Sequence, residues 1–250
     1  MRKPLIMGNW KMYKTVPEAV RLVKQLKVML ADTVDVEIAV CPPFTALQAV
    51  GEVIKGSALK LGAQNLFWEK EGAYTGEISP EMLTDIGVDY CIIGHSERRA
   101  YFHETDADVN RKVKAALAAG LGVVMCVGET LEQRRAGLTQ RVVEEQVTNG
   151  LAGLEVSQAD KLVIAYEPVW AIGTGENATG QDAAEVIAMI RRVAAGIVGE
   201  EIAAEMRILY GGSVKPGNIK EFMAQPEIDG ALVGGASLDA SSFAQIVRYN

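Results

Sequence analysis

Cysteine is scarce in this sequence. Only Cys41, Cys91 and Cys126 occur among 250 residues, and no two of them form a CxxC pair. An odd, widely spaced set of this kind disfavours a cysteine-based zinc site or a redox pair. Each cysteine lies in or beside an apolar run, which is typical of small buried thiols. We therefore expect three reduced, buried cysteines and no metal site.

Positive charge is also in short supply. Lys and Arg number 25 against 32 Asp and Glu, so the formal net charge is −7. Nucleic acids and anionic membranes are bound by broad basic faces, which this balance disfavours. We expect neither as a partner. If the ligand is an anion, a local arrangement of groups must attract it.

Long apolar runs are missing as well. A membrane-spanning helix needs about 20 consecutive apolar residues, and no run in the chain approaches that length. The N-terminal MRKPLIMGNWK carries basic residues, but its apolar stretch is too short for a secretory signal. Hydrophobic residues make up 49% and charged residues 23%, a globular mixture that argues against disorder. These features predict a cytoplasmic protein.

The chain does contain a series of short β-rich runs. Most are almost continuously apolar, as in parallel strands that are covered on both faces. We predict a strand in each of the segments 4–10, 36–42, 59–65, 90–96, 122–129, 161–168, 207–213 and 230–238.

The segments between these runs have helical periodicity. Within 182–199, the apolar residues Val186, Ile190, Val193 and Ile197 fall at spacings of three and four, which predicts one buried helical face. Similar spacing predicts a helix within 103–119, and Pro17 marks the start of another. In 103–119 the predicted buried face consists of Val109, Val113 and Leu117.

Eight strands that alternate with helices predict an α/β protein with a single (β/α)8 barrel, forming one domain over residues 1–250. A doubly wound sheet is the alternative. It is less favoured because no GxGxxG opens the first helix and because such sheets seldom need eight units. In a barrel the active site lies at the carboxyl ends of the strands.

Polar residues and glycines gather at those predicted strand ends. Taken singly, a lysine after a strand is usually a solvated charge, a histidine can be a hydrogen-bonded core residue, and paired glycines mark tight turns. A carboxylate that ends an apolar strand is harder to dismiss, because its burial is costly unless it is paired or used. The barrel brings all of them to one rim: Asn9, Lys11, His95, Ser96, Glu97, Glu129, Glu167, Ser213, Gly234 and Gly235.

This set of side chains suits proton transfer beside a carbonyl group. Glu167 could take a proton from carbon, and partial burial is expected to raise its pKa and strengthen it as a base. His95 could donate a hydrogen bond to the carbonyl oxygen, while Asn9 and Lys11 stabilise the developing oxyanion. The glycine-rich segments YGGSV and ALVGGAS could bring backbone N–H groups close to a phosphate.

Seven motifs carry a resemblance to a known family. NWKMY, QNLFWEKEGAYTGEIS, IIGHSERR, CVGE, AYEPVWAIGTG, YGGSV and ALVGGASL resemble, in order and spacing, the motifs of the triosephosphate isomerase family. The likeness covers essentially the whole chain. It implies a TIM barrel that interconverts dihydroxyacetone phosphate and glyceraldehyde 3-phosphate through an enediol(ate), with no metal and no cofactor.

The resemblance also implies roles for individual residues. Glu167 would be the general base and His95 a neutral electrophile, an assignment that follows the pKa tuning known for this family. Lys11 and Asn9 would orient the substrate, and Glu97 would support Lys11. The implied phosphate contacts are Gly173, Ser213, Gly234 and Gly235.

A lid is implied directly after the base. A stiff hinge would precede a glycine-containing tip, because glycine tolerates the changes of backbone angle that closure requires. Thr179 would end the lid and cap the next helix. The lid residues are Pro168, Val169, Trp170, Ala171, Ile172, Gly173, Thr174 and Gly175.

The connection 65–79 is longer and more aromatic than an ordinary loop between strand and helix. It could fold back on its own surface. The resemblance instead makes it the arm of a homodimer, in which Thr75 and Gly76 reach the partner's site. Tyr13 and Tyr74 stand where the family often has asparagine and phenylalanine, and Tyr74 could alter subunit packing.

Two alternatives remain at this point. Another phosphosugar barrel enzyme would share the phosphate-binding loops but gives no reason for AYEPVWAIGTG. A non-catalytic phosphate-binding barrel is conceivable because a fold alone does not fix function. It is disfavoured because Lys11, His95 and Glu167 are all present.

Overall fold

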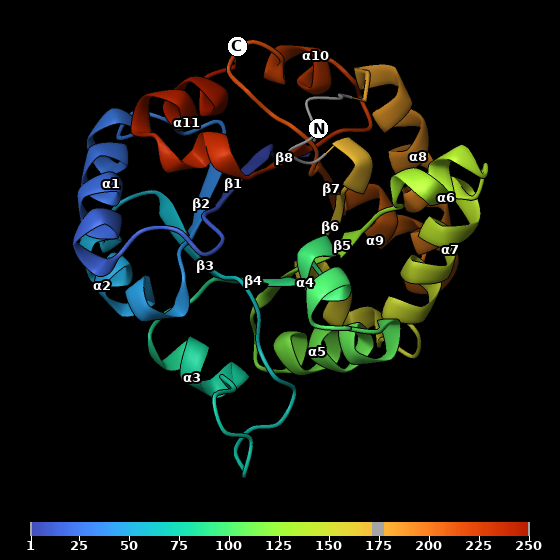
Figure 1. Ribbon diagram of the computed structural model, residues 1–250, viewed down its shortest axis with the longest axis horizontal. Helices are drawn as coiled ribbons and strands as arrows, with labels where there is room; N and C mark the ends of the chain where they lie inside the picture. The colour runs from blue at the N-terminus through green and yellow to red at the C-terminus, as the bar shows by residue number, and fades with distance from the viewer. Residues whose placement is uncertain (1, 172–177, 250) are drawn as a thin grey trace.

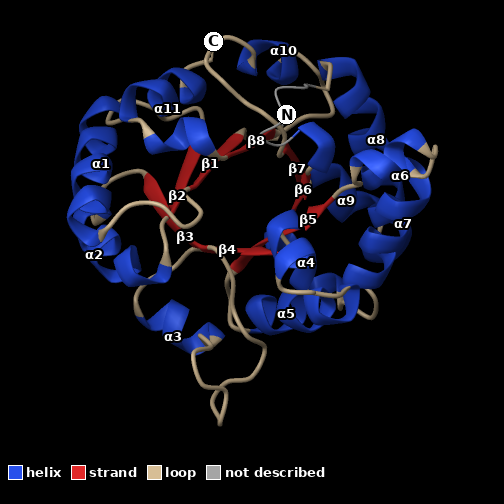
Figure 2. Ribbon diagram, viewed as in Figure 1, coloured by secondary structure: helices blue, strands red, loops and turns tan. Residues whose placement is uncertain are grey.

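A computed structural model of the protein describes residues 2–171 and 178–249. Within these residues the strands β1 to β8 follow one another around a closed barrel, and the helices form a ring outside it (Figure 1, Figure 2). The expected (β/α)8 barrel is therefore confirmed. The strands are β1 (Leu5–Asn9), β2 (Glu37–Cys41), β3 (Leu59–Ala63), β4 (Tyr90–Ile93), β5 (Gly122–Val127), β6 (Leu162–Tyr166), β7 (Arg207–Tyr210) and β8 (Gly230–Val233).

The helices of the ring differ widely in length. The long ones cover the barrel, whereas several short ones lie in the connections that follow the strands. The α-helices are α1 (Val16–Met29), α2 (Phe44–Ile54), α3 (Pro80–Asp85), α4 (Ser96–Tyr101), α5 (Asp106–Ala118), α6 (Leu131–Arg135), α7 (Thr139–Gly150), α8 (Gly180–Val198), α9 (Glu200–Glu205), α10 (Ile219–Met223) and α11 (Ala240–Val247). The 3₁₀ helices are η1 (Val156–Lys161), η2 (Val169–Ala171) and η3 (Gly235–Leu238).

Every strand pairing is parallel, and β8 closes the barrel against β1. Alternate residues of a strand face opposite sides, so Leu5 and Met7 belong to the barrel interior while Ile6 packs outward against the helices. Both faces are thus buried, which explains the nearly continuous apolar runs in the sequence. The three free cysteines are buried in these two layers, as expected.

Each predicted strand overlaps an observed strand, but the predicted segments extend beyond the observed carboxyl ends. The run predicted as 161–168 ends at Tyr166, and the run predicted as 207–213 ends at Tyr210. In both cases the residues beyond the strand leave the sheet and enter the loops that carry the polar side chains. The predicted segments included the polar residues and glycines that follow each strand, such as Glu167 and Gly211, and therefore overestimate these strands.

The helices confirm most of the predicted periodicity. Val109, Val113 and Leu117 are buried on α5, as predicted. On α8 the buried face is rotated relative to the prediction, because Ile187 and Ala194 are buried while Val186 and Val193 are only partly covered. Small side chains such as alanine fill the tightest part of this contact, and a pattern read from large residues alone misses them.

The predicted cap at the start of α8 is confirmed. The Thr179 hydroxyl accepts the Asp182 N–H at 3.1 Å, while the Asp182 carboxylate accepts the Thr179 N–H at 3.3 Å. Together they form a capping box, which satisfies helix-end donors that have no partner within the helix.

The connection between β3 and α3 projects from the body of the barrel (Figure 1). Its central residues 69–77 are exposed, whereas Leu66 at its base is fully buried. The ring of Phe67 contacts those of Trp68 and Tyr74, with centroids 4.0 and 4.6 Å apart. The segment is therefore an internally packed arm, called the β3–α3 arm below.

No helix among residues 2–171 and 178–249 combines the length and apolar character that a bilayer crossing requires.

The closing seam of the barrel depends on Gly230. Its φ is +149°, and a Cβ atom there would lie 1.9 Å from the carbonyl oxygen of Leu5. Two main-chain groups would have to separate, so Gly230→Ala should destabilise the fold by roughly 1–3 kcal/mol or more. The measurement is the free energy of unfolding in denaturant.

Gly196→Ala is the matched control, because Gly196 is an exposed glycine on α8 with open space around its Cβ position. It should stabilise the protein by about 0.5–1 kcal/mol. Equal stability of the two variants would contradict the tight seam.

Candidate active site

A cavity of about 440 Å³ opens at the carboxyl ends of the strands. It brings together seven residues predicted from the sequence: Asn9, Lys11, His95, Glu167, Ser213, Gly234 and Gly235. Its lining also includes Gly211, Gly212, Val214, Leu232 and Ala236, which belong to the glycine-rich segments predicted to approach a phosphate, and Lys215, which the sequence reasoning did not single out. The segment YGGSVKP held a signal for Lys215, since a cation follows the glycines that were assigned to phosphate binding.

Lys11 is held in an unusual backbone conformation after β1. Its φ is +51°, and the side chain of Asn9 accepts its N–H at 3.0 Å. The amide of Gln64 donates to the carbonyl oxygens of Lys11 and Cys41, at 2.8 and 2.9 Å. These contacts fix the direction in which the lysine side chain leaves the rim.

Glu97 pairs with the lysine, as the resemblance implies. Its Oε1 lies 2.6 Å from Lys11 Nζ, and it lines a neighbouring cavity of about 270 Å³ that also borders Asn9 and His95. The pair is partly exposed, so its main effect is to orient the lysine rather than to stabilise the fold.

His95 and Glu167 face each other across the rim. His95 follows β4 and caps α4, where its Nδ1 accepts the Glu97 N–H at 3.2 Å. Its Nε2 lies 2.9 Å from Glu167 Oε1, and Glu167 Oε2 accepts the Ser96 N–H at 3.0 Å. Because Nδ1 accepts a hydrogen bond from the Glu97 N–H, this arrangement favours a proton on Nε2 over one on Nδ1.

The expected direction of the Glu167 pKa shift was wrong for this state of the protein. Burial by itself raises the pKa of Glu167, but contact with His95 and the N–H of Ser96 outweighs burial and holds the pKa below its usual value. The sequence suggested a half-buried carboxylate, whereas the structure buries it completely and supplies partners for both oxygens.

The same contact acts on the histidine in the opposite sense. Burial lowers the pKa of His95, but the carboxylate of Glu167 raises it, and the net shift is upward. The expectation of a neutral ring rested on the helix N-terminus alone and did not include this partner. A neutral ring during the reaction stays a prediction.

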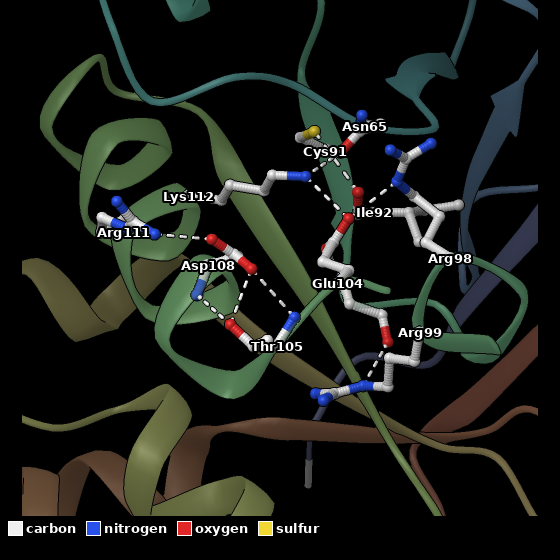
Figure 3. Close-up of polar contacts among 11 residues, drawn as sticks. Asn65, Cys91, Ile92, Arg98, Arg99, Glu104, Thr105, Asp108, Arg111 and Lys112 are labelled. Atoms are coloured by element: carbon white, nitrogen blue, oxygen red, sulfur yellow. Dashed lines mark hydrogen bonds and ion pairs between the residues drawn. The ribbon is translucent and has the colours of Figure 1, made fainter. Parts of the chain in front are cut away.

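A buried ionic cluster supports the corner between β4 and α4 (Figure 3). Glu104 accepts hydrogen bonds from Lys112 Nζ and Arg98 Nε, both at 2.7 Å, and from the N–H of Gly94 at 3.1 Å. Lys112 also donates to Asn65 at the base of the β3–α3 arm, at 2.8 Å. Burial raises the pKa of Glu104, but these cations outweigh it and keep the carboxylate charged.

The predicted hinge is attached to Glu129, a polar strand end to which the sequence gave no role. Glu129 is fully buried, and its carboxylate accepts from Trp170 Nε1 at 3.0 Å and from the Tyr166 hydroxyl at 3.1 Å. Its carbonyl oxygen accepts the Val169 N–H at 3.1 Å. Pro168 to Ala171 thus start the predicted lid from a fixed base, while Ile172, Gly173, Thr174 and Gly175 lie outside the described residues.

The loops after β7 and β8 contribute Ser213, Gly234 and Gly235 to the wall of the cavity. A Cβ on Gly235 would meet open space, and one on Gly234 would approach only the Lys11 side chain, at 3.6 Å. Their backbone is therefore accessible from the cavity. Two lysines, Lys11 and Lys215, give this wall the local positive charge that an anionic ligand requires.

Among residues 2–171 and 178–249, His, Cys, Asp and Glu side chains nowhere gather in a group of three that could hold a metal ion. The prediction that neither metal nor cofactor takes part stays a prediction.

Fold and site together define a class of protein. A (β/α)8 barrel whose rim combines a carboxylate, an imidazole, a lysine and an accessible glycine backbone is suited to acid–base chemistry on a small phosphorylated carbonyl compound.

Comparison with known proteins makes the assignment specific. The sequence profile described as "Triosephosphate isomerase" matches residues 4–250. The chain is 60% identical over 248 residues to triosephosphate isomerase of Carboxydothermus hydrogenoformans, covering 99% of both chains. It is also 60% identical to that of Moorella thermoacetica, over all of both chains, and 59% identical to that of Chloroflexus aurantiacus, again over all of both. The chain belongs to the triosephosphate isomerase family.

The Glu167–His95 contact makes a prediction about titration. Glu167→Gln removes the charge that raises the pKa of His95 and leaves the burial that lowers it, so the pKa of His95 should fall. The protonated ring would then be lost at lower pH than in the unmodified protein. A nitrogen NMR titration of the imidazole measures this directly.

Ser213→Ala is the control, because Ser213 lines the same cavity on a different loop. It should leave the pKa of His95 in place. A higher pKa of His95 in Glu167→Gln would show that the carboxylate does not set it.

Proposed function

We propose that this protein interconverts dihydroxyacetone phosphate and D-glyceraldehyde 3-phosphate, with Glu167 as the base. The protein is an isomerase of the family identified above. The observation that carries the assignment of roles is the direct contact between Glu167 and His95 at the mouth of a cavity that also holds Lys11 and the Ser213 and Gly234 loops.

In the proposed reaction Glu167 removes a proton from the carbon beside the carbonyl group. The Nε2–H of His95 donates to the carbonyl oxygen, and Lys11 and Asn9 stabilise the negative charge that develops there. The resulting enediol(ate) is reprotonated on the neighbouring carbon by the same carboxyl group. The hydroxyl proton on the oxygen of the first carbon passes to the former carbonyl oxygen, so that the carbonyl and hydroxyl groups exchange places. Side chains alone supply this chemistry, so we propose that no metal or cofactor takes part.

The pKa of Glu167 then depends on the substrate. In the ligand-free protein His95 and Ser96 stabilise the carboxylate. When the substrate takes the hydrogen bond of His95, the carboxylate loses that partner while it stays buried. Burial now dominates and raises its pKa, which makes it a stronger base when the substrate carbon is in reach.

The phosphate group is proposed to rest on the backbone of Ser213, Gly234 and Gly235, together with Gly173 of the lid. Support comes from the accessible backbone on the loops after β7 and β8 and from the nearby lysines. The lid, Pro168 to Gly175, is proposed to shield the intermediate from water. Glu97 is proposed to keep Lys11 directed at the substrate, which its 2.6 Å contact supports.

A homodimer is part of the proposal. Large hydrophobic side chains are exposed around the second rim cavity, among them Met12 at 94% and Phe102 at 64%. The exposed part of the β3–α3 arm includes Thr75 and Gly76. We propose that the arm of one subunit enters this cavity in the other, next to Asn9, Lys11 and His95.

The remaining proposals concern organisation and setting. We propose that residues 1–250 act as one domain. The net charge of −7 supports a protein that binds neither nucleic acid nor membrane. The free, buried cysteines support a reducing compartment such as the cytoplasm.

Replacing the base gives the sharpest test of the reaction. Glu167→Gln keeps the shape of the side chain but cannot accept the proton, so kcat should fall by roughly 10²–10⁴ or more. A coupled spectrophotometric isomerase assay measures the change. Inhibition by inorganic phosphate should be retained, because the proposed phosphate site lies on other loops. A folded variant with most of its activity would refute the role of Glu167.

The dimer proposal predicts that activity requires the dimer and therefore depends on protein concentration. Light scattering at assay concentration should give twice the mass of the 26.9 kDa chain. Shortening the arm by removing 72–76 should give monomers with far lower kcat, because the cavity beside His95 is left open. A fully active monomer would overturn the proposal.

A further inference from the structure

Gln146 makes an unusual pair of hydrogen bonds. It lies half-buried on α7, and its side-chain amide forms hydrogen bonds with both main-chain polar groups of Gly128. Its Oε1 accepts the Gly128 N–H at 2.7 Å, and its Nε2 donates to the Gly128 carbonyl oxygen at 3.2 Å. A side-chain amide has one acceptor group and one donor group, as a peptide group does, so it can replace a strand as a partner.

The pair compensates for a strand that ends early. β4 pairs with β5 only as far as Ile93, opposite Met125, and the chain then turns at Gly94 with φ +73°. No main-chain hydrogen bond from β4 reaches Gly128 in the part of the chain that the structure describes. Without Gln146 the N–H and carbonyl groups of half-buried Gly128 would have no protein partner among the described residues, and polar groups shielded from water are costly to leave unpaired.

Gly128 in turn sets the position of the base and the hinge. The residue before it, Val127, accepts the Glu167 N–H at 2.7 Å. The residue after it, Glu129, accepts the Val169 N–H at 3.1 Å. A Cβ on Gly128 would lie 1.7 Å from the Glu167 carbonyl oxygen, so the two backbones are in direct contact.

Gln146 also borders the space behind the base. A cavity of about 310 Å³, separate from the active-site cavity, is lined by Gln146 together with Ser96, Gly128, Glu167 and Val169. Among the described residues, only the side-chain amide of Gln146 forms hydrogen bonds to the main chain of Gly128 on the side that faces this cavity. The open space allows Gly128 to move if the amide is lost.

We propose that Gln146 is a positioning residue for the isomerase reaction. Its amide forms the hydrogen bonds to Gly128 that β4 does not supply. It thereby keeps residues 127–129 paired with Glu167 and Val169. It does not touch the substrate. The inference rests on the proposed role of Glu167 as the base, and it adds a residue on the outer helical ring to the machinery that places this carboxylate.

The test is Gln146→Met, which preserves the length of the side chain and removes both hydrogen bonds. Displacement of a reacting group by about 1 Å can cost 10²-fold in rate, so we expect kcat to fall by roughly 10- to 100-fold. KM and the inhibition constant for inorganic phosphate should stay within about twofold. Hydrogen exchange of the Glu167 and Val169 amides should become faster in the folded protein.

Two further variants separate positioning from general destabilisation. Asn110→Leu removes a comparable pair of bonds, since the Asn110 amide donates to the carbonyl oxygens of Gly150 and Ala152 at 2.9 and 3.0 Å. It should lower the unfolding temperature similarly but leave kcat unchanged. Gln146→Glu keeps an acceptor for the Gly128 N–H and should recover part of the lost kcat.

Each outcome decides for or against the inference. Unchanged kcat in folded Gln146→Met overturns it, as does an equal loss of kcat in Asn110→Leu. If Gln146→Met does not fold, two other measurements test the inference: the kcat of Gln146→Glu and the hydrogen exchange of the Gly128 amide in the unmodified protein. Rapid exchange of that amide overturns the inference. Should Glu167→Gln lower kcat as expected while folded Gln146→Met leaves kcat unchanged, the proposed function stands and only this inference fails.

Discussion

The complete burial of the Glu167 carboxylate is the constraint on which the rest of the site depends. A buried charge without partners is very costly, so the protein must supply a donor for each oxygen. Both donors, His95 Nε2 and the Ser96 N–H, come from the corner between β4 and α4. That corner is itself held by Glu104, whose charge is neutralised by Lys112 and Arg98. The position of one carboxylate thus requires an ionic cluster beneath its partners.

Under the proposed mechanism, these contacts explain how Glu167 can be held as a carboxylate and still act as a base. The partners that hold Glu167 are groups that a substrate would also use, since His95 can donate its Nε2 proton to only one acceptor at a time. Stabilisation of the carboxylate and binding of a carbonyl oxygen therefore compete. The net charge of −7 does not oppose the anionic substrate strongly, because Lys11 and Lys215 dominate the field within the cavity.

Much of the fold was predictable from the sequence, because apolar runs and helical spacing reflect burial of the same residues. The positions of Asn9, His95 and Glu167 at strand ends were predictable for the same reason. The pKa of Glu167 was not, since Ser96 lies 71 residues away in the chain and its N–H gives no sequence signal. Gln146 was missed because a polar residue on a helix usually faces solvent, and Glu104 because a charged residue in the short connection between α4 and α5 gives no sequence sign of burial.

Glycine follows each of the strands beside β6, and this explains why the position of Glu167 is set by backbone rather than by side-chain packing. On one side a Cβ at Gly128 would lie 1.7 Å from the Glu167 carbonyl oxygen; on the other, a Cβ at Gly211 would lie 2.8 Å from Glu167 Cγ. Val127 and Tyr166 accept the N–H groups of Glu167 and Gly211, each at 2.7 Å. Backbone contacts cannot relax by a change of rotamer, so they transmit small shifts directly. The same rigidity that places Glu167 accurately makes the site depend on whatever holds the neighbouring strands, including side chains on the outer helices.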